Sequence, residues 1–243
     1  MFTLYYKEIS SFLNSLIGYV VITVFLLINA LFLWVFQFDF NILDGGYANI
    51  DGLFTIAPFV FLFLIPAITM RSFADERKSG TIELLMTKPL TDYQIIFAKY
   101  FAGLTLVIFS LLPTLIFFFS VYRLGANVGN IDIGGTWASY IGLLFLGATF
   151  VAIGLFCSSI TETQIVAFIL AVFICWFTYM GFESIYSLEL FGKIDLFIKT
   201  LGISDHYASI SRGVIDSRDV LYFLSIAGLF IILTKLSLVS RKL

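Results

Sequence analysis

The sequence predicts an all-α membrane protein, and two observations support this fold class. Of its 243 residues, 60% are hydrophobic and 12% are charged, and the mean hydropathy is +1.02. A soluble domain of this length could not bury so much apolar surface around one core. The apolar residues also gather into six runs, each long enough as a helix to cross about 30 Å of hydrocarbon. We therefore expect lipid to surround most of the chain.

The limits of the six expected spans follow from hydropathy and from local capping signals. Thr91 and Gln94 have the spacing of a capping box before span three, and Thr161 and Gln164 repeat that spacing before span five. The segment 39–52 is rich in turn-forming residues. The sequence thus predicts a single transmembrane domain, 1–243, with spans at about 16–38, 53–70, 93–121, 138–157, 164–186 and 220–239.

Two segments outside the spans also have an expected structure. In residues 1–14, Thr3 and Lys7 fall on one helical face and Phe2 and Ile9 on the other, which predicts an N-terminal interfacial helix. The long segment 187–219 is too apolar for a solvated loop. We expect it to form short outer helices before span six that lie against the membrane face or partly re-enter it.

Lysine and arginine predict the orientation, because they are enriched in cytoplasmic loops. With the N-terminus inside, nine of them fall on the inner side and five on the outer side. The contrast is clearest in the first two connections, since 39–52 has none and 71–92 has four. We therefore expect a multi-pass protein with both termini in the cytoplasm.

The inner segment 70–90 is the most charged part of the chain. A charged stretch ends at Gly80, an expected helix stop. Thr81 can cap a second, short helix, with Glu83 in its first turn, where the helix dipole favours a carboxylate. That helix has an apolar face that includes Ile82, so it could fit a groove on a soluble partner.

This segment resembles the permeases of the ABC-2 family of ATP-binding-cassette transporters. The residues that carry the resemblance are Arg71, Asp75-Glu76-Arg77, Gly80-Thr81-Ile82-Glu83-Leu84-Leu85 and Lys88-Pro89. The length, the six spans and the inner termini agree with it. More narrowly, the chain resembles the gliding-motility permease subunit of Bacteroidota. The residues that carry this resemblance are the opening from Lys7-Glu8 through Gly18-Tyr19, Leu31-Phe32-Leu33-Trp34, Phe40-Asn41-Ile42-Leu43-Asp44 and Ser211-Arg212-Gly213-Val214-Ile215-Asp216.

The resemblance implies the membrane half of an exporter in a bacterial inner membrane. It implies pairing with a second permease copy or a paralogous membrane subunit, and a separately encoded ATPase that carries ATP and Mg²⁺. The gliding family also implies a role in surface motility. The ATPase would dock on a cytoplasmic coupling helix between spans two and three, at Asp75, Glu76, Arg77, Gly80, Thr81, Ile82, Glu83, Leu84 and Leu85.

No motif in the sequence indicates that the chain is itself an enzyme. It lacks the G-x-x-x-x-G-K-[ST], H-E-x-x-H and G-x-S-x-G patterns, so we expect no catalytic residue, metal or bound cofactor. A net charge of −2 also argues against a nucleic-acid partner. His206, the single histidine, is interpreted as a polar loop residue, and Cys157 and Cys175 as small core hydrophobes.

Several alternatives stay open at this point. The chain could be a mechanotransmission subunit that drives a periplasmic partner through 187–219, or a non-transporting scaffold of a motility complex. An intramembrane enzyme would need paired ionisable groups at one depth, and the spans offer almost none. Glu183 is a candidate intramembrane functional residue, or a hydrated carboxylate at the interface. Gly142, Gly147 and Gly154 allow close helix approach, at a dimer seam or inside the protomer.

Overall fold

A computed structural model describes residues 1–38, 40–86, 89–125, 127–189 and 192–240, which form helices and no strand. The α-helices, in chain order, are α1 (Phe2–Leu13), α2 (Leu16–Trp34), α3 (Asp51–Thr69), α4 (Arg71–Lys78), α5 (Thr81–Met86), α6 (Asp92–Leu111), α7 (Leu115–Leu124), α8 (Ile133–Ile160), α9 (Gln164–Trp176), α10 (Phe182–Tyr186), α11 (Asp195–Thr200), α12 (Ile203–Ser211) and α13 (Ser217–Val239). Two 3₁₀ turns, η1 (Leu112–Thr114) and η3 (Gly192–Ile194), and one π-helical turn, η2 (Phe177–Gly181), complete the elements.

Six helical segments among the described residues are long and apolar enough to span a membrane, which confirms the predicted number. They are Leu16–Trp34, Asp51–Lys78, Asp92–Leu124, Ile133–Ile160, Gln164–Tyr186 and Ser217–Val239. The prediction placed the end of span one too late. The chain turns after Trp34, where the Asn41 amide donates to the Phe36 carbonyl (2.9 Å) and the Ile42 N–H donates to the Leu33 carbonyl (2.9 Å).

Local caps fix the other ends. Span four begins five residues earlier than predicted, because the Asp132 carboxylate accepts the Gly135 N–H and caps α8. The capping box of Thr91 and Gln94 is confirmed, with both reciprocal hydrogen bonds present. The box expected at Thr161 is wrong, since Thr163 caps α9 instead by accepting the Val166 N–H.

Helix α8 is the centre of the bundle and packs against α3, α6, α9, α12 and α13. Its glycines face neighbours within the protomer. A Cβ on Gly154 would lie 2.0 Å from Thr69 Oγ1 of α3, and one on Gly147 would lie 2.8 Å from Val107 of α6. Of the two readings of these glycines, the structure therefore supports close packing inside the protomer.

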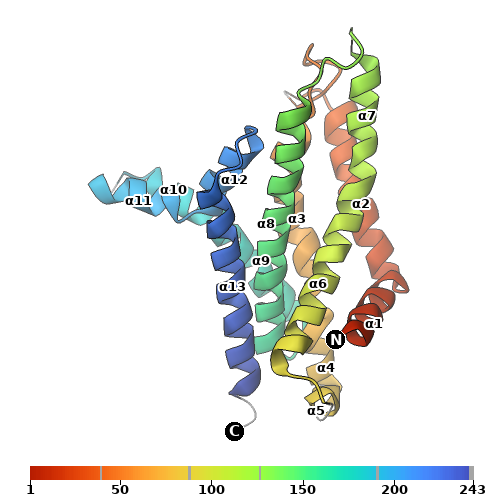
Figure 1. Ribbon diagram of the computed structural model, residues 1–243, viewed down its shortest axis with the longest axis vertical. Helices are drawn as coiled ribbons and strands as arrows, with labels where there is room; N and C mark the ends of the chain where they lie inside the picture. Colours follow the sequence, from red (N-terminus) through yellow and green to blue (C-terminus); the bar gives the residue numbers. More distant parts are fainter. Residues whose placement is uncertain (39, 87–88, 126, 190–191, 241–243) are drawn as a thin grey trace.

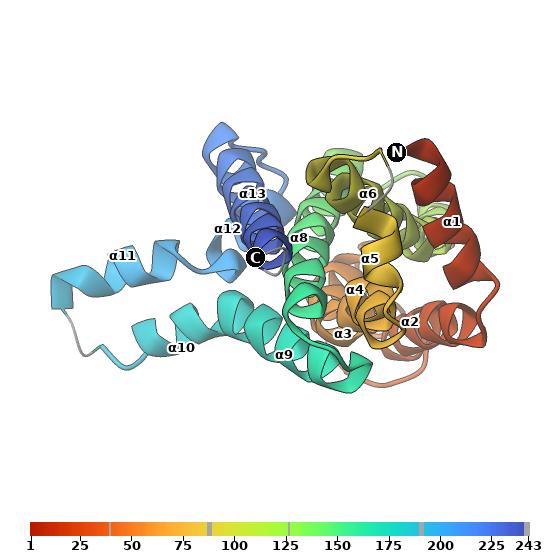
Figure 2. The ribbon, with the colours of Figure 1, turned by 90° about the horizontal axis from the view of Figure 1, so that it is seen from below.

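The spans stand side by side, and Met1, α4, α5 and the last turn of α13 lie at the same end of the bundle (Figure 1). Helix α1 lies across that end and packs along α6, with Leu4 and Phe12 buried. Beside α12 and the start of α13, α10 and α11 project sideways from the bundle, which is also clear from below in Figure 2. We call the described residues from Phe182 to Thr200, which include α10, η3 and α11, the lateral arm. These elements confirm the all-α fold, with an N-terminal helix, a short helix between spans two and three, and further short helices before span six.

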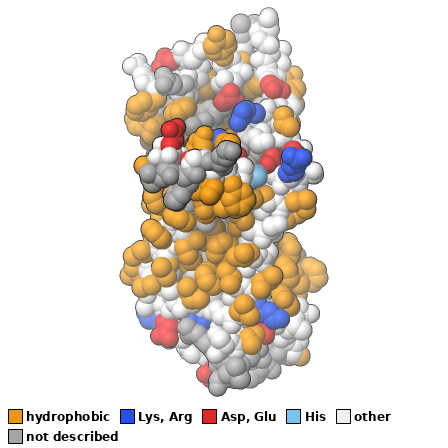
Figure 3. Space-filling model, turned by 90° about the vertical axis from the view of Figure 1, so that its left-hand side faces the viewer, with side chains coloured by type: hydrophobic (Ala, Val, Ile, Leu, Met, Phe, Trp, Pro, Cys, Tyr) orange, Lys and Arg blue, Asp and Glu red, His pale blue; other side chains and the backbone are white. Residues whose placement is uncertain are grey.

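The surface has the polarity of a membrane protein. On the face shown in Figure 3, hydrophobic side chains cover the middle of the molecule and charged side chains lie toward its ends. Ile169 and Phe173 of α9 and Leu224 of α13 are among the large apolar side chains exposed there or on neighbouring faces. Such a surface is stable in lipid and would aggregate in water, so the chain is a multi-pass membrane protein.

Candidate functional site

The charged segment between spans two and three folds into two helices with a tight turn between them. We call this unit, Arg71–Met86, the α4–α5 element. Gly80 has a φ of +68°, a left-handed conformation suited to glycine, and its N–H donates to the Arg77 carbonyl (3.0 Å). The Ser79 hydroxyl donates to the Asp75 carbonyl (2.7 Å) and so satisfies another of the last acceptors of α4. The predicted helix stop at Gly80 is confirmed.

The tip of this element is exposed. Thr81 and Glu83 of α5 are exposed, and Ile82 is half-buried against the core. The Thr81 hydroxyl lies 2.8 Å from the Ser79 hydroxyl, which fixes α5 against the end of α4. The side chains of Leu84 and Leu85, like residues 87 and 88, lie outside the described part of the structure. The structure therefore brings Asp75, Glu76 and Arg77 into one helix and Gly80 to Glu83 into the turn and tip that follow it.

At its base, the α4–α5 element is held by a buried lysine of span three. The Lys99 side chain of α6 is 1% exposed, and its Nζ lies 2.9 Å from Glu8 Oε1 of α1 and 3.0 Å from Glu76 Oε1 of α4. Nζ also donates to the Ser72 carbonyl (2.6 Å). Three acceptors thus meet the three N–H groups of one ammonium. We call these groups the Lys99 cluster.

The Lys99 cluster has one solvent-exposed edge, which we call its rim, and one buried side. Lys7 of α1, 61% exposed, lies 3.4 Å from Glu76 Oε1 and adds a second, solvated cation. On the inner side, Lys99 Nζ lies 5.0 Å from the centre of the Phe73 ring, within range of a cation–π contact. Without Lys99, the carboxylates of Glu8 and Glu76 would face each other largely out of water, which is costly. The cluster therefore joins α1, α4 and α6 at one point.

A serine of span four is inserted at the junction of α3 and α4. The Ser158 hydroxyl of α8 accepts the N–H groups of Phe73 (2.9 Å) and Ala74 (3.1 Å) and donates to the Met70 carbonyl (3.0 Å). A side chain inserted into a helical hydrogen-bond ladder is a recognised cause of a helix break. In addition, Gln164 at the start of α9 donates to the Asp75 carboxylate. The α4–α5 element is therefore attached to spans two to five.

Sequence reasoning missed these attachments, although one signal was present. Lys99 lies inside predicted span three, and a lysine within a span usually has a partner nearby. Its partners cannot be identified from spacing, because Glu8 is 91 positions away and Ser72 is 27 away. Ser158 carries no sequence signal at all, since serines that bond to their own helix are common in spans.

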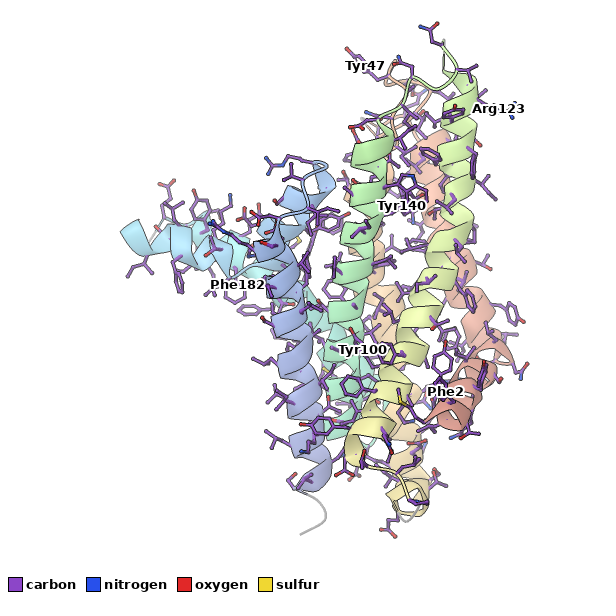
Figure 4. The ribbon with its side chains drawn as sticks, viewed as in Figure 1. Phe2, Tyr47, Tyr100, Arg123, Tyr140 and Phe182 are labelled. Carbon is purple, nitrogen blue, oxygen red and sulfur yellow. The ribbon has the colours of Figure 1, made fainter. Side chains whose placement is uncertain are left out.

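The remaining candidate residue, Glu183, lies away from this element, at the start of the lateral arm on the side of the bundle (Figure 1). It is exposed at the start of α10 and accepts a hydrogen bond from Ser204 (2.7 Å). It lines a cavity of about 590 Å³ together with Asp51, Asp132 and Arg212. Figure 4 places Tyr47 and Arg123 toward one end of the molecule, Phe2 and Tyr100 toward the end with α4 and α5, and Phe182, next to Glu183, between them. The structure thus favours a hydrated position for Glu183.

The cavity floor includes Tyr207 of α12, whose hydroxyl donates to the Phe54 carbonyl (2.6 Å). Burial raises the pKa of Tyr207 well above its ordinary value, so the side chain stays neutral. Cys157 and Cys175 are buried free thiols, as expected of core residues. Among the described residues, no group of three histidine, cysteine or acidic side chains could hold a metal ion.

Six spans, with α8 at their centre and a charged helical element at one end, fit the class of multi-pass transporter permeases. A family model described as ABC-2 family transporter protein matches residues 3–240, almost the whole chain. The chain therefore belongs to the ABC-2 family and is a membrane permease component of an ABC transporter. Such family members are typically non-catalytic membrane components that work with a partner ATPase. A search among curated proteins finds no match.

Proposed function

We propose that this chain is the membrane permease subunit of an ABC exporter, and that a separately encoded ATPase docks on the α4–α5 element. The observation that carries the proposal is the contrast within that element, whose tip at Thr81 and Glu83 is exposed while its base at Lys99 is buried. A docking surface that transmits force must be accessible to its partner at the tip and firmly attached to the spans at the base. In this proposal ATP and Mg²⁺ bind to the ATPase, and this chain provides no catalytic residue.

The orientation is part of the proposal. The end that carries α5 faces the cytoplasm of a bacterial inner membrane, and both termini lie on that side. The lysine and arginine excess in 71–92 over 39–52 supports this orientation. The α4–α5 element then faces the compartment that contains ATP.

The proposed mechanism is a rigid-body transmission. Closure of the ATPases on nucleotide pushes α5, and α4 moves with it. Because Ser158 joins α4 to α8 and Lys99 joins it to α6 and α1, the displacement reaches several spans together. Helices that shift as packed units account for the alternation between inward-open and outward-open arrangements.

The proposal includes further partners. A second copy of this chain or a paralogous membrane subunit completes the transmembrane unit, and lipids surround it. The resemblance to the gliding-motility subunit supports a role in motility as the finer assignment. The lateral arm favours one second candidate, mechanotransmission to a periplasmic partner without solute transport, because it exposes Leu188, Leu196 and Phe197 beside the bundle. A non-transporting scaffold would need no docking element.

The test is the stimulated ATP hydrolysis of the cognate ABC ATPase, reconstituted with this chain in nanodiscs, together with co-purification. Glu83→Arg reverses an exposed charge on α5 and should lower both binding and stimulation at least about tenfold, since a wrong charge at an interface costs several kcal/mol. Glu189→Arg, an equally exposed reversal on the lateral arm, is the control and should change neither. Equal loss in both variants, or in neither, would contradict the docking surface.

A further inference from the structure

The single histidine is held between two acceptors at the base of the lateral arm. His206 of α12 places Nδ1 2.6 Å from Asp219 Oδ1 of α13 and Nε2 2.9 Å from the carbonyl of Thr200, the last residue of α11. Its ring stacks on Tyr222 of α13 at 3.8 Å between centroids. The His206 and Asp219 side chains are 16% and 9% exposed. This geometry contradicts the sequence-based interpretation of His206 as a simple polar loop residue.

The two contacts together determine how many protons the pair holds. A neutral imidazole has one N–H, so it can donate to Asp219 or to the Thr200 carbonyl but not to both. Both contacts are favourable only when the pair holds two protons, either as imidazolium with carboxylate or as neutral imidazole with protonated Asp219. Asp219 Oδ2 is buried and has no hydrogen-bond partner in the described part of the chain, which favours a cation beside it.

Two neighbouring charged groups already have partners, so the His206–Asp219 pair is the group that we expect to respond to pH. On α11, Lys199 is paired with Asp205 of α12 (3.1 Å). On α10, the Glu183 carboxylate accepts a hydrogen bond from the Ser204 hydroxyl of α12. The other ionisable groups on the packed elements are Tyr186 of α10, Asp195 of α11, Tyr207 of α12 and Arg212 after it, Asp216 before α13, Arg218, Tyr222 and Lys235 of α13, Tyr179 of η2, and Tyr140 and Cys157 of α8. Of these, Tyr222 donates its hydroxyl to the Leu201 carbonyl (2.5 Å) and stays neutral while it does so.

We propose that His206 and Asp219 form a proton-binding site that controls the joint between the lateral arm and the bundle. With two protons bound, α12 is fixed to both α11 and α13. On loss of one proton, the imidazole keeps its N–H toward Asp219, and the lone pair of Nε2 faces the Thr200 carbonyl. That contact becomes repulsive, so the Thr200 carbonyl loses its attachment to His206 and the end of α11 is held to α12 only by the more exposed pair of Lys199 and Asp205. The inference does not rest on ATPase docking.

The first test is nuclear magnetic resonance of the full-length chain in nanodiscs with isotope-labelled histidine, purified through a histidine-free tag. One histidine in the chain gives one imidazole signal. Measurements run from about pH 5 to about pH 9, which brackets the ordinary histidine value of about 6.5. We expect two protonated ring nitrogens at the low end and loss of the Nε2 proton as the pH rises. One protonated nitrogen beside an ionised Asp219 throughout would overturn the proposal.

The second test is hydrogen exchange of the backbone amides at the end of α11, corrected for intrinsic chemistry. Loss of a charge-assisted hydrogen bond should speed exchange there about tenfold or more at high pH. His206→Gln should remove this pH dependence and give the fast rate at every pH. Tyr222→Phe is the matched control, because it removes the bond to Leu201 and keeps His206. A pH step that persists in His206→Gln would overturn the proposal.

Discussion

The Lys99 cluster and the His206 pair each join three helices through a nitrogen base, but the two bases differ. Each places a nitrogen base where three helices meet, next to a carboxylate and a backbone carbonyl. Lys99 meets its acceptors with the three N–H groups of one ammonium, whereas His206 needs a second proton on the pair to meet both of its acceptors. The difference indicates a fixed joint at the α4–α5 element and an adjustable one at the lateral arm.

The two joints also differ in the contacts that hold them in addition to the charged groups. The α4–α5 element has a second, uncharged attachment, because Ser158 bonds to three backbone groups at the start of α4. The lateral arm has other attachments beside the His206 pair, from Lys199 to Asp205, from Ser204 to Glu183 and from Tyr222 to Leu201, but these contacts are solvent-exposed. An element that transmits force benefits from redundant attachments.

The largest effect is expected when the fixed joint loses its cation. Lys99→Met leaves the mostly buried carboxylates of Glu8 and Glu76 with only the exposed Lys7 beside them, and removing one member of a buried ion pair typically costs about 3–5 kcal/mol. The measurement is thermal unfolding of the purified chain in detergent. Lys99→Arg keeps the charge and should recover a large part of the loss. Unchanged unfolding in Lys99→Met would show that the cluster does not hold the helices together.

A smaller effect is expected at the uncharged attachment. Ser158→Ala leaves two N–H groups and one carbonyl of the α3–α4 junction without this partner, at a cost of about 1–3 kcal/mol. Ser159→Ala is the control, because that buried hydroxyl bonds within its own helix. If Ser158 transmits force, its variant should also bind the ATPase normally and stimulate it less. Equal behaviour of the two variants would refute a special role for Ser158.

The adjustable joint should show its effect through pH. A hydrogen bond to a charged group is worth about 1.5–3 kcal/mol, and this contribution is present when the His206 pair is fully protonated and is lost as the pH rises. His206→Gln should therefore lower unfolding stability at low pH and approach the wild type at high pH. Chemical unfolding at several pH values measures this. If the free energies of unfolding of the two proteins changed with pH in the same way, the contrast between an adjustable joint at His206 and a fixed joint at Lys99 would be wrong.

The smallest effect is expected at the solvated rim of the Lys99 cluster. Lys7 is 61% exposed, and exposed ion pairs contribute about 0–1 kcal/mol. Lys7→Ala should leave the unfolding temperature within error of the wild type in physiological salt. A loss as large as that in Lys99→Met would mean that Glu76 depends on both lysines equally.

The fold was largely predictable, because hydropathy over about twenty residues and caps such as Thr91 are local signals. Short helices before span six were expected, and their sideways projection was not, since it depends on how α12 packs against α8 and α13. The tip of the α4–α5 element was found through Gly80 and Glu83. Its base was not, because Lys99, Glu8 and Ser158 meet only in three dimensions. The same limit hid His206 and Asp219, whose proximity depends on the turn between α12 and α13.

The most direct test of the central claim is site-specific photocrosslinking in cells that contain the cognate ATPase. A photoreactive amino acid replaces Glu83 on α5 in one variant and Leu196 on the lateral arm in another, and both positions are exposed. The account predicts a crosslink to the ATPase from position 83 and none from position 196. A crosslink from position 196 alone would place the ATPase on the lateral arm, away from α5, and contradict both the docking surface and the orientation.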